Sequence, residues 1–246
     1  MFVHGLWGSD ETWKNGKHTW PQLITADGQF DGYDVYTASY GTSLGYSASG
    51  NNTRLTEVAS GFSQYLPKLT NYRSVHLVGH SMGGNVILTS FILLKLRYPD
   101  AHQILSGVRD VILLGTPIEG TDLANFAWVV SSDIKLTALK PIAQNELPIL
   151  VELGLNAIDE KRNVLGLPAI PIFAGFERKR YDGVGPIIVS ERSATAVALP
   201  QHRCGFDKDH KHLVKPADSH DPVYVWVAAL IQASARNEEH FGCTSN

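Results

Sequence analysis

The most constraining feature of this chain is an alternation of short strand-like runs with segments of helical periodicity. Runs rich in apolar, aromatic or β-branched residues predict strands. They lie at residues 2–3, 33–40, 74–78, 108–114 and 170–174. Between and after them, apolar residues recur at helical spacing over 55–69, 82–97 and 222–236. Strands that alternate with helices favour a central, mostly parallel sheet with helices on both faces. We therefore predict an α/β fold.

The length of the chain suits one domain. It has 246 residues, of which 43% are hydrophobic and 18% are charged, an ordinary globular balance. Residues 118–168 interrupt the alternation, because ordinary connections run to about 2–6 residues. Apolar residues recur there at helical intervals. We predict a single domain over 1–246, with a helical insertion at 118–168 that is either a cap (lid) over the site or an extension of the core.

Charge and hydropathy exclude several classes of partner. The net charge is −3, from 21 Lys and Arg against 24 Asp and Glu, which does not indicate nucleic acid binding. The longest apolar stretch, Val86 to Leu94, is too short to span a bilayer, although peripheral membrane contact stays open. No basic start with an apolar run is present, so a cytoplasmic location is the default expectation. The first strand begins almost at Met1, so an upstream segment could be missing.

The cysteines and polar clusters do not indicate a metal or a cofactor. Cys204 and Cys243 could form a disulfide, but the sequence leaves that pairing open. No CxxC pair exists, which argues against a thiolate zinc site. Alternating Asp and His residues over 207–212 are more typical of a solvated loop than of a metal site. We expect no metal and no cofactor.

The segment GHSMGG at residues 79–84 follows the GxSxG pattern. It lies between the predicted strand 74–78 and the predicted helix 82–97. A sharp strand–turn–helix bend needs small neighbours and exposes its central serine, while the helix N-terminus favours developing negative charge. We predict that Ser81 is a catalytic nucleophile. The alternative is a serine that only caps the helix.

Four segments resemble lipase-like α/β-hydrolases, and in particular serine-active-site-containing esterases related to GPI-inositol deacylases. They are FVHGLWGSDETW from residue 2, GHSMGG from residue 79, LGTPIEGT from residue 114, and DHKHLVKP with DPVY from residues 209 and 221. They follow the family's order and span nearly the whole chain, whereas 41–52 and 118–168 match no such motif. The resemblance implies the α/β-hydrolase fold and an ester substrate.

The resemblance also implies which groups surround Ser81. The backbone amides of Leu6 and Met82 would form the oxyanion hole, and His4 is best interpreted as a structural residue that shapes the first loop. Among the later histidines, His210 precedes Lys215-Pro216 at the family's spacing, so it is the predicted base. His212 is the alternative.

The acid is expected in the loop after the strand 170–174, because the chain order in this fold is serine, acid, histidine. Asp182, within YDGVG, resembles the Asp-Gly pattern of lipases. The stretch from Asp182 to Ser193 is longer than the family's, however, so Glu191 and then Glu177 stay open as alternatives.

The predicted function is therefore a serine hydrolase that cleaves carboxylic esters, of small-molecule acyl or lipid type, through an acyl-enzyme. The same residues could transfer the acyl group to an alcohol, and a non-catalytic binding module on the same fold is the third alternative. Trp7, Trp13 and Trp20 could line an acyl pocket or pack in the core. The sequence leaves the oligomeric state open.

Overall fold

The structure is a computed structural model. It describes residues 1–5, 8–16, 18–40, 55–119, 155–156, 158–160, 162–164, 166, 169–236, 238 and 243. Leu6, Trp7, the loop 41–52 and most of the insertion 118–168 lie outside the described residues. The predicted cap therefore stays a prediction.

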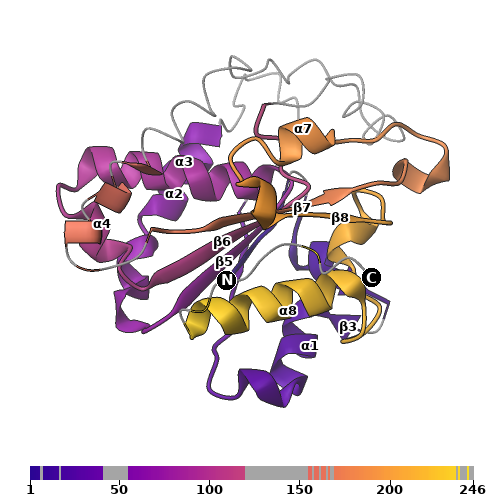
Figure 1. The fold of residues 1–246 in the computed structure, drawn as a ribbon, viewed down its shortest axis with the longest axis horizontal. Coiled ribbons are helices and arrows are strands. Elements are labelled where there is room, and N and C mark those ends of the chain that lie inside the picture. Colours follow the sequence, from indigo (N-terminus) through magenta and orange to yellow (C-terminus); the bar gives the residue numbers. More distant parts are fainter. Residues whose placement is uncertain are drawn as a thin grey trace.

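Six parallel strands form the central sheet of the described chain (Figure 1). Their spatial order is β4 (Thr37–Ala38), β1 (Phe2–Val3), β5 (Val75–His80), β6 (Val108–Leu114), β7 (Ile172–Glu177) and β8 (Arg203–Phe206). Every pairing within this sheet is parallel. A separate antiparallel hairpin joins β2 (Lys14–Asn15) to β3 (His18–Thr19). The predicted α/β-hydrolase fold is confirmed.

Helices cover both faces of the sheet (Figure 1). One face carries α2 (Leu55–Ser63) and α3 (Met82–Arg97), and the other carries α1 (Trp20–Ala26) and α8 (Pro222–Ala235). Each face has its own buried apolar cluster. Shorter helices are α4 (Ala101–Ile104) and α7 (Glu191–Ala194), and 3-10 turns lie at Asp10–Trp13, Gly28–Phe30, Leu66–Asn71, Tyr181–Gly183, Pro200–His202 and His212–Val214.

Local sequence explains where these elements begin and end. Every residue of β5 and β7 is buried, as expected of central strands with helices on both sides. The helix α8 begins where Asp221 caps it, since the Asp221 Oδ1 accepts a hydrogen bond of 3.1 Å from the Val223 amide. Pro222 occupies its first turn, where a missing N–H costs nothing.

Several elements differ from the sequence prediction. The predicted strand 33–40 pairs only over Thr37–Ala38, because it is an edge strand whose single neighbour, β1, is equally short. The predicted helix 55–69 ends at Ser63 and continues as a 3-10 turn that contains Pro67, which has no N–H to donate. β8 was not predicted, since its four residues include a glycine and an arginine.

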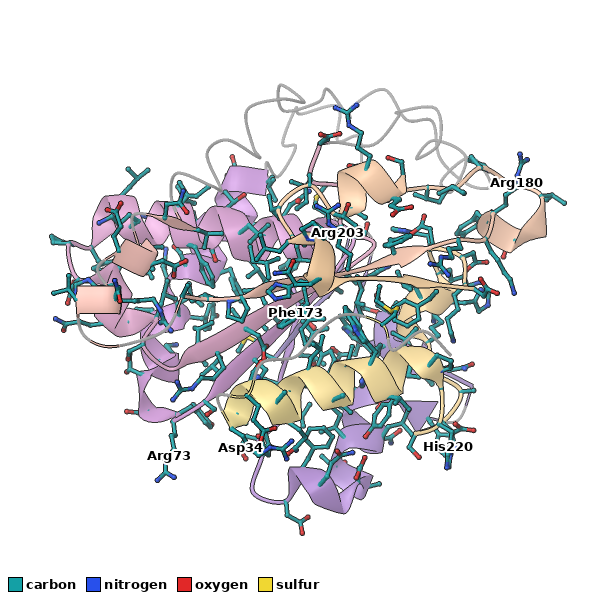
Figure 2. All side chains as sticks on the ribbon, viewed as in Figure 1. Asp34, Arg73, Phe173, Arg180, Arg203 and His220 are labelled. Carbon is teal, nitrogen blue, oxygen red and sulfur yellow. A yellow bond between two sulfur atoms is a disulfide. The ribbon has the colours of Figure 1, made fainter. Side chains whose placement is uncertain are left out.

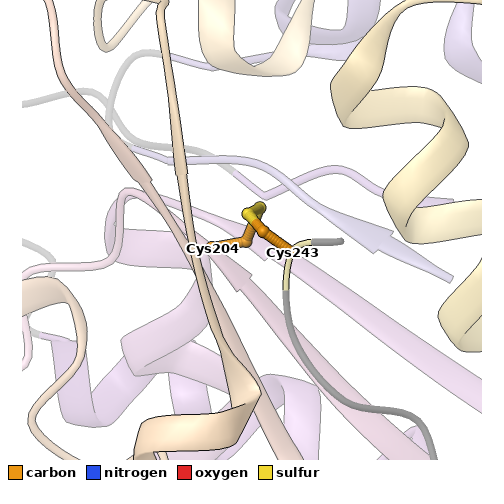
Figure 3. The surroundings of a disulfide bond; sticks show 2 residues. All are labelled: Cys204 and Cys243. Carbon is orange, nitrogen blue, oxygen red and sulfur yellow. A yellow bond between two sulfur atoms is a disulfide. The ribbon is translucent and has the colours of Figure 1, made fainter. Parts of the chain in front are cut away.

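A disulfide joins Cys204 of β8 to Cys243 near the end of the chain (Figure 3). The two Cα atoms lie 5.1 Å apart, within the range that such bonds require. Disulfides are typical of proteins that fold in oxidising compartments, whereas the default expectation from sequence is the cytoplasm. The cytoplasmic location stays a prediction. Among the described helices, none is long and apolar enough to cross a membrane.

The described aromatic residues of the first loop belong to the core. Trp13 and Trp20 are almost fully buried, and each packs against Phe2. Their interpretation as core residues is therefore preferred over an acyl-pocket lining. The described end of the insertion also packs on the core, because Ile158 is buried and Arg162 donates hydrogen bonds to the carbonyls of Leu105 and Val108.

Candidate active site

The carboxyl ends of the parallel strands lie along one edge of the sheet, where open α/β folds bind their ligands. Ser81 directly follows β5, Glu177 is the last residue of β7, and His210 lies a few residues after β8. Gly115 follows β6, which runs between β5 and β7. The fold thus brings residues from distant parts of the sequence to one edge.

Ser81 lies in a backbone conformation that few side chains adopt. Its φ is 52° and its ψ is −129°. Such a conformation costs about 1–3 kcal/mol and is typical of functional sites. The Ser81 amide donates to the carbonyl of Leu114 at 2.9 Å, which anchors the bend to β6. The Ser81 hydroxyl makes no capping hydrogen bond to helix α3. The helix-capping alternative therefore lacks the contact that it requires.

Two glycines explain why the bend can be so sharp. A Cβ atom added at Gly83 would lie 2.1 Å from the Val3 carbonyl oxygen, and one added at Gly84 would lie 2.1 Å from the Thr116 Oγ1. Both distances are far shorter than any contact that a real Cβ atom makes. The first turn of α3 therefore packs directly on β1 and on the segment after β6. This close approach aims the positive end of the α3 dipole at the space beside Ser81.

The loop after β1 reaches the same point. A Cβ atom added at Gly5 would lie 3.3 Å from the Ser81 Oγ. The His4 Nε2 accepts from the Tyr40 amide at 3.3 Å, so its Nδ1 carries the proton and donates to the Gly5 carbonyl at 2.8 Å. Burial lowers the pKa of His4, which favours this neutral form. These contacts support the structural interpretation of His4.

His210 and Glu177 form a buried pair beside this bend. The His210 Nδ1 lies 2.8 Å from the Glu177 Oε2, and both side chains are at least nine-tenths buried. The other carboxylate oxygen, Oε1, accepts the Val189 amide at 2.8 Å. A carboxylate held at both oxygens fixes the imidazole ring and leaves its Nε2 as the nitrogen for chemistry. No described residue forms a hydrogen bond with this Nε2.

The structure brings Glu177 to His210, and it does not bring Asp182 or Glu191 there. Asp182 is exposed, and its amide donates to the Asp209 Oδ2 at 3.2 Å. Glu191 is exposed in the first turn of α7. The predicted strand ends at residue 174, whereas β7 continues to Glu177. This residue lies at the strand end, ahead of the loop in which the acid was expected.

His212, the alternative base, faces another way. Its side chain is 52% exposed, and its Nδ1 lies 2.7 Å from the Asp209 Oδ1. Burial acts to raise the pKa of Asp209, but hydrogen bonds from the His212 amide and ring and from the Asp182 amide lower it overall. Asp209 thus organises the loop that carries His210. Sequence reasoning missed this role, although the Asp-His dipeptide was visible.

A groove opens beside Glu177 and the segment that follows β7. Figure 2 shows Arg180 far out on this segment, which extends away from the sheet. The groove has a mixed lining that includes apolar side chains, two arginines and two carboxylates, one of which is Glu177. These residues include Phe176, Pro186, Ile187, Arg178, Arg180 and Glu191. Among the described residues, no group of three or more His, Cys, Asp or Glu side chains could hold a metal ion.

Known structures share this architecture. The chain aligns over 92% of its length with 90% of the lipase BlEst2 from Bacillus licheniformis in mature form, at 22% identity and a TM-score of 0.55. It also aligns over 96% of its length with 59% of the phospholipase PlaB from Legionella pneumophila, at 15% identity and a TM-score of 0.58. At these identities the similarity establishes the fold alone.

A search of curated proteins found no match to this sequence. A family model does match it, over residues 1–237, and this model describes the alpha/beta hydrolase family. The match covers almost the whole chain, including Ser81, Glu177 and His210. The chain belongs to the alpha/beta hydrolase family.

Proposed function

We propose that this protein hydrolyses carboxylic esters through an acyl-enzyme on Ser81. The observation that carries the proposal is the combination of a strained serine bend and a buried His210–Glu177 pair at the same sheet edge. Because backbone strain and a buried carboxylate both lower stability, their coincidence at one edge favours catalysis over a structural role.

In the proposed reaction, the Ser81 oxygen attacks the ester carbonyl carbon while the His210 Nε2 takes the serine proton. Glu177 holds the ring in the tautomer that leaves Nε2 unprotonated and stabilises the imidazolium that forms. When the tetrahedral intermediate collapses, His210 returns the proton to the departing alkoxide, and the alcohol leaves. Water then attacks the acyl-enzyme by the same route and releases the acid.

The negative charge on the carbonyl oxygen requires donors. We assign this role to the Met82 amide, which lies in the first turn of α3 and has no intrahelical partner. We assign the second donor to the Leu6 amide, as the resemblance implies, because Leu6 follows Gly5 in sequence and Gly5 lies close to Ser81. Removal of one such donor typically costs about 3–4 kcal/mol of transition-state stabilisation.

Glu177 takes the acid's role in this proposal, in place of Asp182. Its Oε2 contacts the His210 Nδ1 directly. Asp182 instead contacts the His210 loop only through its amide. Because the Asp182 carboxylate is exposed, water screens its charge, so it would contribute little to stabilising the imidazolium.

A fluorophosphonate probe tests the proposal, because it phosphonylates activated serines. We expect rapid labelling of the wild type and none of Ser81→Ala, with mass spectrometry placing the adduct on residue 81. Ser63 is a buried serine outside the site, so Ser63→Ala is a matched control that should label normally. A folded wild type that does not label would favour the non-catalytic binding module instead.

The mixed apolar and charged groove beside Glu177 is compatible with an amphiphilic ester. The similar folds of a lipase and a phospholipase agree with this direction. A series of p-nitrophenyl esters from acetyl to palmitoyl measures the preference. A maximum of kcat/KM at a medium or long chain supports a lipid substrate, and a maximum at acetyl contradicts it.

A further inference from the structure

We propose that His80 is a positioning residue, which fixes the backbone of His210 relative to Ser81. This inference rests on the proposed function, because it assigns His210 as the base. His80 is the last residue of β5 and the direct neighbour of Ser81. The same strand end would thus hold both the nucleophile and the partner that must take its proton.

The contacts of His80 lead straight to His210. The His80 Nε2 lies 3.1 Å from the His210 backbone carbonyl oxygen, across 130 positions of sequence. The two imidazole rings also pack together, with centroids 4.8 Å apart and planes tilted by 40°. On another side, the His80 ring meets Trp13 edge-on at 6.3 Å between centroids. His80 is therefore held between a buried tryptophan and the proposed base.

The hydrogen bond fixes the protonation form of His80. A carbonyl oxygen only accepts, so the His80 Nε2 must carry the proton and donate it. The Nδ1 of His80 is enclosed and has no hydrogen-bond partner among the described residues. Burial lowers the pKa of His80 well below its usual value and the charge of His210 lowers it further, although the hydrogen bond to the His210 carbonyl acts to raise it. Lys215 and His4 also act to lower this pKa. The ring is therefore neutral, with its hydrogen on Nε2.

Two anchors then hold His210. His80 holds the main chain of His210 through its carbonyl, and Glu177 holds the ring through Nδ1. Other contacts hold the neighbours of His210: the Asp209 carboxylate accepts the amides of His212 and Asp182, and the Lys208 carbonyl accepts backbone amides from the segment after β7. A misplacement of about 1 Å in a catalytic group can cost about 10²-fold in rate. The His80 contact therefore controls a distance on which turnover depends.

The test is a matched pair of substitutions at this position. In His80→Gln, the side-chain amide nitrogen can reach the position of the imidazole Nε2 and donate to the same carbonyl. In His80→Met, a side chain of similar length has no donor. We expect kcat to fall about 10–100-fold in His80→Met with KM changed less than about threefold, and to recover to within about fivefold of wild type in His80→Gln.

A residue that only fills space would give another pattern. Equal kcat in the two variants, at equal thermal stability, would overturn the positioning role. Because His80→Met could fail to fold, histidine ¹⁵N NMR of the wild type provides a second test. We expect His80 to be neutral and protonated at Nε2 around neutral pH, because burial lowers its pKa. A proton on Nδ1 at that pH would also overturn the proposal.

Failure of the proposed function would look different. If the wild type itself does not react with the fluorophosphonate, the hydrolase proposal fails, and the positioning role of His80 fails with it. If the wild type reacts and both His80 variants match it in kcat, the hydrolase proposal stands and only the role of His80 is wrong.

Discussion

Among the described residues, the sheet carries a fully buried histidine–carboxylate pair near each end of its strands. At the carboxyl end, the His210 Nδ1 lies 2.8 Å from the Glu177 Oε2. Near the amino end, the His76 Nδ1 lies 2.7 Å from the Asp110 Oδ2. All four side chains are at least nine-tenths buried. By geometry alone, the two pairs are nearly equivalent.

Their surroundings differ. His210 lies beside the strained bend at Ser81, and the loop after β1 reaches the same point. His76 lies inside the sheet on β5, with the Tyr33 ring 6.1 Å away between centroids. Its Nε2 is enclosed and has no hydrogen-bond partner among the described residues. The comparison teaches that a buried pair becomes a candidate base only where its second nitrogen can meet a nucleophile.

The largest difference between the pairs should appear when the histidines are replaced. His210→Ala should lower kcat by about 10⁴–10⁶-fold, because the serine then has no base. His76→Gln should leave kcat within about threefold of wild type. Steady-state hydrolysis of a p-nitrophenyl ester measures both. A comparable loss of kcat in His76→Gln would show that the His76–Asp110 pair is also needed for catalysis.

The next largest difference is expected between substitutions of the two candidate acids, Glu177 and Asp182. Glu177→Gln should lower kcat by about 10²–10⁴-fold, since the amide no longer supports the imidazolium or enforces the tautomer. Asp182→Asn, at the position favoured by sequence, should stay within about threefold of wild type. If the two results are exchanged, Asp182 is the acid and the Glu177 contact is structural.

The His76–Asp110 pair should affect the stability of the protein and not its activity. Asp110→Ala leaves the His76 Nδ1 buried without its partner, which should lower the free energy of unfolding by about 2–3 kcal/mol. Urea unfolding followed by fluorescence measures this change. The value of kcat per folded molecule should be unaffected. A loss of activity without a loss of stability would show that the His76–Asp110 pair also acts on the candidate active site.

The smallest effect concerns the strain at the bend. Ser81→Gly and Ser81→Ala should both be inactive, but glycine accepts a φ of 52° without strain, whereas alanine does not. We expect Ser81→Gly to be more stable than Ser81→Ala by about 1 kcal/mol, despite the entropy that glycine loses on folding. Paired thermal melts measure the difference. An equal or lower stability of the glycine variant would mean that the bend stores no strain.

Much of this architecture could be predicted from sequence because it depends on local pattern. The apolar strands, the glycines around Ser81 and the cap at Asp221 are visible in short windows. Ser81 and His210 lie at the same sheet edge as expected, although their catalytic roles stay predictions.

The rest depends on the exact ends of elements and on contacts across the chain. The position of Glu177 beside His210 follows from three extra residues of β7, and strand ends are the least predictable feature of a strand. The short edge strand β8 carries no alternation strong enough to recognise. The contact between His80 and His210 joins residues 130 positions apart, and no local pattern encodes it.

The disulfide between Cys204 and Cys243 encloses both His210 and helix α8 within one covalent ring, with a sequence separation of 39. A protease cut inside this ring would leave the two fragments joined. The nicked protein would keep its full mass on a non-reducing gel and release a short carboxyl-terminal piece only after reduction. The proposed base would therefore stay attached to the sheet wherever the cut falls. A cut after His210 leaves it joined through β8, and a cut before it leaves it joined through the disulfide.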